Sequence, residues 1–107
     1  MERVELEGIE NLDKDQKYQL NKIVNHYFDK IKRVIKNDMT LFVKIKQYET
    51  AGKKDKAKKS SIQVIVKTSV KNLEASSSDW DLNRTLHGVF KKILAEIEHK
   101  FRVSEQR

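Results

Sequence analysis

Apolar and charged residues alternate over several short stretches of the chain, the pattern of half-buried β-strands. The first stretch covers residues 3–8, residues 39–48 predict a second strand, and residues 61–70 predict a third. A tight turn at Lys71-Asn72 then leads into a short fourth strand over residues 73–77. The positions predicted to face inward are Val4, Leu6, Leu41, Val43, Ile45, Ile62, Val64, Val66 and Thr68.

Two longer stretches have apolar residues three and four positions apart, which predicts amphipathic helices. The first covers about 13–36 and starts with Asp13 and Gln16, spaced as in a capping box. The second follows a similar pair, Ser78 and Asp81, and runs to about residue 102. The predicted apolar stripes are Leu20, Val24, Tyr27, Ile31 and Val34 on the first helix, and Leu82, Leu86, Val89, Phe90, Ile93, Ile97 and Phe101 on the second.

The predicted order of elements is therefore β-α-β-β-β-α. Two helices with one apolar stripe each need a common surface to cover, and one face of a four-stranded sheet supplies it. We expect an α+β fold with both helices packed on one face of that sheet. An alternative is a three-stranded sheet in which 61–77 is one long bent strand. The other face would stay partly open, with Phe42, Lys44, Lys46, Ile65 and Lys67 on it.

The length of 107 residues suits a single basic domain, with a Lys-rich loop at 49–60 and a short C-terminal tail at 103–107. Charged residues make up 36% of the chain, and 23 Lys and Arg outnumber 16 Asp and Glu to give a net charge of +7. Such an excess favours a polyanionic partner, nucleic acid or an anionic membrane, although lysines also simply keep surfaces soluble. The N-terminus has no apolar signal region and no stretch is long enough to cross a bilayer, so we expect a cytoplasmic protein without a membrane partner.

The basic residues are clustered rather than evenly spread. Several lie opposite the apolar stripes of the two helices, and others fill the loop at 49–60. Clustered cations can contact RNA phosphates, whereas the alternative is that each face is merely solvated. Phe42 and Tyr48 could stack bases, but aromatic residues in strands also serve packing. The predicted RNA-binding residues are Lys22, Lys30, Arg33, Lys36, Arg84, Lys91, Lys92, Lys53 and Lys54.

Residues that would support catalysis or metal binding do not form a recognisable pattern. There is no cysteine, and His26, His87 and His99 share no metal-ligand spacing. The serines at 76–78 fit a strand end and helix cap better than a nucleophile, and Glu96 and Glu98 cannot share one helix face. We therefore expect no enzyme, no metal, no cofactor and no small-molecule substrate.

Besides this order of elements, the chain contains Tyr27-Phe28-x-x-Ile31, the strand Leu41–Ile45 and, most distinctively, Leu73–Ser76 leading into Asp79–His87. In these features it resembles the ribosome hibernation-promoting factor and ribosome-associated inhibitor family over nearly its whole length. The chain has Asn83 where that family tends to have Tyr, and His87 where it tends to have Asp.

The resemblance implies a translation inhibitor that docks on rRNA in the decoding region of the small ribosomal subunit and is a monomer when free. It would be a short form, because the chain ends at Arg107 without the C-terminal dimerisation domain of long members. Two alternatives stay open. One is a double-stranded-RNA reader of α-β-β-β-α type, and the other is a protein-interaction domain whose lysines are only solvated.

Overall fold

The structure is a computed structural model that describes residues 3–10, 12–35, 38–49 and 58–99. Its elements follow in the order β-α-β-β-β-α, which confirms the predicted α+β fold. Their bounds are β1 Arg3–Glu7, α1 Lys14–Val34, β2 Met39–Glu49, β3 Lys58–Thr68, β4 Asn72–Asp79 and α2 Leu82–Ile97.

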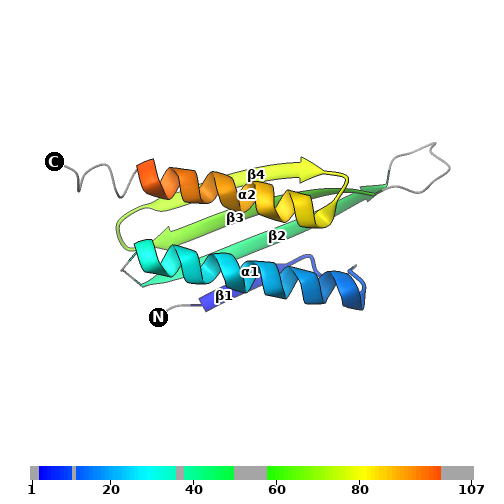
Figure 1. Ribbon diagram of the computed structural model, residues 1–107, viewed down its shortest axis with the longest axis horizontal. Helices are drawn as coiled ribbons and strands as arrows, with labels where there is room; N and C mark the ends of the chain where they lie inside the picture. Colours follow the sequence, from blue (N-terminus) through cyan, green and yellow to red (C-terminus); the bar gives the residue numbers. More distant parts are fainter. Residues whose placement is uncertain (1–2, 11, 36–37, 50–57, 100–107) are drawn as a thin grey trace.

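The four strands form one mixed sheet in the order β1-β2-β3-β4. β1 pairs with β2 in parallel, which requires a crossover connection, and α1 provides it. The other two pairings are antiparallel, and Val43 lies opposite Val64 in the β2–β3 register. Since β3 and β4 are separate paired strands, the three-stranded alternative is excluded. Both helices cover the same face of the sheet and run side by side in the same direction (Figure 1).

The core is the layer between the helices and the covered face of the sheet. The residues predicted to face inward from β2 and β3 are buried, apart from the half-buried Thr68 at the end of β3. The described stripe residues of both helices meet them there, and among these Val34 alone is half-buried. Full burial of such an apolar side chain contributes about 1.5–3 kcal/mol to the stability of the folded state. Phe101, the last residue of the predicted second stripe, lies outside the described residues. The helix residues in this layer are Leu20, Ile23, Val24, Tyr27 and Ile31 from α1 and Leu82, Thr85, Leu86, Val89, Phe90, Ile93 and Ile97 from α2.

Each helix begins at an aspartate cap. At α1 the Asp13 carboxylate accepts from the Gln16 backbone N–H at 2.8 Å, and the Gln16 side chain accepts from the Asp13 N–H at 3.1 Å. This is the predicted capping box. At α2 the prediction was wrong by three residues: Ser78 lies within β4, and Asp81 is the cap, accepting from the Arg84 N–H at 3.1 Å.

The strands extend further than their apolar alternation indicates. The β2–β3 ladder continues to the pair Glu49–Lys58, so the predicted loop at 49–60 was too long. Polar residues pair at the start of this extension: Ser60 is buried and accepts from the Gln47 side-chain amide at 3.4 Å. β4 likewise runs to Asp79, two residues beyond the predicted strand.

The turn between β3 and β4 lies slightly earlier than predicted. The Thr68 hydroxyl accepts from the N–H groups of Val70 and Lys71 and donates to the Lys71 carbonyl, which fixes the chain reversal. Asn72 is therefore not in the turn but begins β4, where it pairs with Lys67. A Thr hydroxyl can replace backbone hydrogen bonds in a turn, and the prediction, which was based on Asn72, did not use this signal.

Candidate nucleic-acid interface

Six of the predicted RNA-binding residues lie in the described part of the chain, and all six side chains are exposed on the helices. Lys22, Lys30 and Arg33 belong to α1, whereas Arg84, Lys91 and Lys92 belong to α2. The other three, Lys36, Lys53 and Lys54, lie outside the described residues, as does most of the predicted Lys-rich loop and the whole tail at 103–107.

A groove of about 360 Å³ runs between the outer sides of the two helices. We call it the interhelix groove. Its polar side chains offer amide, imidazole and ammonium groups, and an isoleucine lies among them. The lining residues are Gln19, Lys22, Ile23, His26, Asn83 and His87.

Basic residues continue along both sides of this groove at helical spacing. On α1, Lys30 follows His26 by one turn and Arg33 follows Lys30 by three residues. On α2, Lys91 follows His87 by one turn. Of the predicted residues, Lys22 lines the groove, and helical spacing places three more on the continuation of its two sides; we name this set of four the groove rim. It consists of Lys22, Lys30, Arg33 and Lys91.

The other two predicted residues on α2 point away from the groove. Arg84 Nε lies 3.0 Å from a carboxylate oxygen of Asp79, at the end of β4. Lys92 Nζ donates to the backbone carbonyl of Ser76, also in β4, at 2.8 Å. Both cations therefore lean toward the β4 edge and interact with their own chain. The predicted set is split into a groove rim and a pair held at β4.

Both histidines that line the groove, His26 and His87, contact a buried aromatic residue, Tyr27. Its hydroxyl shares a hydrogen bond of 2.8 Å with His87 Nδ1, and its ring packs edge-on against His26 at 5.2 Å between centroids. Beneath it the Phe90 ring is stacked at 4.8 Å and 4°. Burial raises the pKa of the Tyr27 phenol above its usual 10.0, so the phenol stays neutral beside the lysines.

This contact was not predicted from the sequence. Both histidines are exposed at the surface of the helices. The missing information was which helix sides face each other. Tyr27 and His87 are 60 residues apart, and a single sequence has no signal that pairs them.

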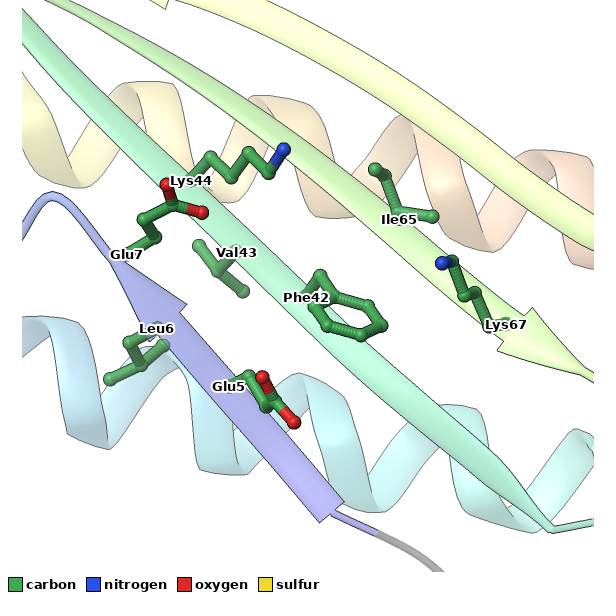
Figure 2. A pocket seen from close by; sticks show the side chains of 8 residues that line it. All are labelled: Glu5, Leu6, Glu7, Phe42, Val43, Lys44, Ile65 and Lys67. Atoms are coloured by element: carbon green, nitrogen blue, oxygen red, sulfur yellow. The ribbon is translucent and has the colours of Figure 1, made fainter.

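The uncovered face of the sheet has a different composition. Phe42 and Ile65 lie directly opposite each other on β2 and β3 and are half-buried, while the neighbouring Lys44, Lys46 and Lys67 are exposed, as predicted. Figure 2 shows the Phe42 ring and Ile65 on this face, with the amino groups of Lys44 and Lys67 on either side. The Lys67 amino group lies 5.0 Å from the centre of the Phe42 ring. The side chain of Tyr48, the other predicted stacking residue, lies outside the described part.

Two hollows of about 400 and 450 Å³ follow this face along the central strands. Their carboxylates come from Glu5 and Glu7 on the edge strand β1. At the opposite edge the Glu74 carboxylate accepts from the Gln63 amide. On this face, the described side chains of β2 and β3 include lysines and no carboxylate.

Among the described residues, no cluster of three or more His, Cys, Asp or Glu side chains could hold a metal ion. Neither α1 nor α2, the helices of the described part, combines the length and the apolar character of a membrane-spanning helix.

No family model and no curated protein sequence matches the chain. Among solved structures, the chain is similar to the N-terminal domain of Protein Y from Thermus thermophilus, with a TM-score of 0.61 and 11% identity over 90% of this chain and 93% of that one. It is also similar to a ribosomal subunit interface protein from Coxiella burnetii, with a TM-score of 0.54 and 13% identity over the whole of both chains. The chain shares their fold. The resemblance of fold to the hibernation-promoting family is confirmed.

Proposed function

We propose that the protein binds the small ribosomal subunit through the groove rim and inhibits translation by covering rRNA of the decoding region. The observation that carries the proposal is a groove that Lys22 lines and that Lys30, Arg33 and Lys91 continue at helical spacing, in a fold that a ribosomal subunit interface protein also has. The proposal implies a cytoplasmic, non-enzymatic protein whose partner is the ribosome and which is a monomer when free.

The chemistry of the groove rim suits folded RNA. Exposed ammonium and guanidinium groups release counterions when they contact phosphates, and this supplies affinity without reading sequence. Because the cations belong to two helices, they can contact phosphates on both sides of the groove. We therefore expect binding to depend on RNA shape and on salt more than on base identity.

A double charge reversal tests the proposal. Arg33→Glu with Lys91→Glu alters one rim residue on each helix, and both side chains are exposed, so the circular dichroism spectrum should be unchanged. Co-sedimentation with ribosomes at moderate salt should be lost, and inhibition of a cell-free translation reaction should be relieved. A double variant that still binds and inhibits like the wild type would contradict the proposal.

The matched control is Lys14→Glu with Lys17→Glu. It changes the net charge by the same amount, but both residues lie in the first turn of α1, outside the groove and outside the helical rows that continue it. Acidic side chains there also interact favourably with the positive end of the helix dipole, so stability should not fall. Ribosome binding should stay close to wild type. An equal loss of ribosome binding in the charge-reversal variant and in this control would mean that only the net charge of the protein matters.

The same assay separates the two alternatives left by the sequence. Binding to naked duplex RNA without binding to ribosomes would support a double-stranded-RNA reader. Binding to neither would support a protein-interaction domain with a solvated surface.

A further inference from the structure

The uncovered face of the sheet carries a second row of cations that the groove rim does not include. Lys44 and Lys46 come from β2, and Lys59 and Lys67 from β3, and all four are exposed. In the β2–β3 register, Lys67 lies opposite Thr40 and Ser61 lies opposite Lys46. The row therefore covers six residues of strand between these levels, roughly 20 Å, and continues to Lys59. We call Lys44, Lys46, Lys59 and Lys67 the sheet row.

Aromatic side chains accompany this row at two places. Phe42 lies between the levels of Lys67 and Lys44, opposite Ile65 (Figure 2). Trp80 follows the end of β4 and is 52% exposed, and the Lys59 amino group lies 6.0 Å from its ring. The exposed half of Trp80 lies at the end of a sheet that carries hollows and lysines, and it adds no buried apolar surface to the core. Ring faces interspersed with cations are what a single-stranded nucleic acid needs, because its bases stack and its phosphates pair with lysines.

The charge distribution favours this ligand over other occupants. A protein interface would need a larger apolar centre than Phe42 and Ile65, and the centre of such interfaces is depleted of charged residues. Duplex RNA keeps its bases stacked inside, where Phe42 could not reach them. The carboxylates of Glu5, Glu7 and Glu74 lie on the two edge strands. They would repel a polyanion and so confine it to the central strands β2 and β3.

We propose that the uncovered face of the sheet binds single-stranded RNA, with phosphates on the sheet row and bases stacked on Phe42 and Trp80. Since the helices cover the opposite face, this site goes beyond the ribosome contact proposed for the groove rim, and both surfaces can be occupied at once (Figure 1). Bases on Phe42 would displace the Lys67 ammonium from its ring, freeing it for a neighbouring phosphate.

The sole tryptophan makes the site measurable in the intact protein. Labelled oligouridylate of about 12 nucleotides is titrated with protein, affinity is measured by anisotropy, and Trp80 emission is recorded in parallel. We expect single-stranded RNA to bind and quench Trp80, and a duplex of the same length to leave the emission unchanged. Absence of binding, or equal quenching by the duplex, would overturn the proposal.

Two variants locate the binding. Phe42→Leu keeps an apolar side chain at a half-buried position but removes the ring, and should weaken binding of the single strand at least about 5-fold. Lys46→Glu should also weaken it and reduce its dependence on salt. If both variants bind like the wild type, the sheet face is not the site.

Lys91→Glu serves as the control from the other face of the molecule. It should leave oligouridylate binding unchanged while weakening ribosome co-sedimentation. If the wild type does not bind ribosomes but its binding of single-stranded RNA still depends on Phe42, only the ribosome proposal fails. If Lys91→Glu weakens oligouridylate binding as much as Lys46→Glu does, the single strand binds the helices and the sheet proposal fails.

Discussion

Gly8 follows β1 with a φ of 85°, in the left-handed region that side chains other than glycine rarely adopt. A Cβ atom built there would overlap the carbonyl oxygen of Ile45 and lie 3.1 Å from its carbon, so backbone and not a movable side chain blocks it. We predict that Gly8→Ala lowers the free energy of unfolding by at least roughly 1–3 kcal/mol, the strain of the φ alone. Urea denaturation measures the loss.

Gly88 provides the control, because it lies inside α2 where alanine is favoured by up to about 1 kcal/mol. The nearest atom to its added Cβ would be the Ser77 hydroxyl at 3.3 Å, a side chain that can adjust. Gly88→Ala should therefore change stability little. If Gly8→Ala were equally mild, the loop after β1 would have to differ from the one described.

At the scale of elements, hydrophobic periodicity predicted β1, β2, β3 and both helices of the described part, and a turn signal predicted β4, but several of the predicted ends were wrong. Leu41, Val43 and Ile45 alternate cleanly, and that pattern identified β2. The end of the β2–β3 ladder depends instead on polar residues such as Gln47 and Ser60, and the start of α2 depends on which of two possible caps is used. Pairing and capping choices of this kind depend on tertiary neighbours, so alternation alone does not determine them.

Phe90 joins the two helices to each other and to the sheet. It is fully buried and its ring is stacked on Tyr27 of α1. We predict that Phe90→Ala lowers the free energy of unfolding by roughly 3–5 kcal/mol, because it removes apolar contacts and leaves a cavity. The denaturation midpoint gives the measurement. Tyr18→Ala, at a position 62% exposed on α1, should change it by less than about 0.5 kcal/mol. Equal shifts for the two variants would place Phe90 outside the core.

At the scale of the whole molecule, the sequence predicted which helix residues are basic and exposed, but not which of them share a surface. Helical angles treat each helix separately, so Arg84 and Lys91 look equivalent on α2. In the structure Arg84 pairs with Asp79 at the β4 edge, whereas Lys91 lies one helical turn beyond His87, which lines the groove. The relative placement of two helices, and of β4 beside one of them, follows from packing across the entire core.

The division of the predicted cations between the groove rim and the β4 edge gives a quantitative prediction for ribosome binding. Each cation that neutralises a phosphate steepens the fall of log affinity with log salt, and removing one such contact reduces the slope by about 1. The rim double variant Lys30→Gln with Lys91→Gln should therefore reduce the slope by about 2. Arg84→Gln with Lys92→Gln removes the same charge from residues already held by Asp79 and the Ser76 carbonyl, and should reduce it much less. Co-sedimentation over a salt series measures both slopes. Equal slopes for the two variants would mean that the cations act through total charge, and that the division between groove rim and β4 edge has no role in binding.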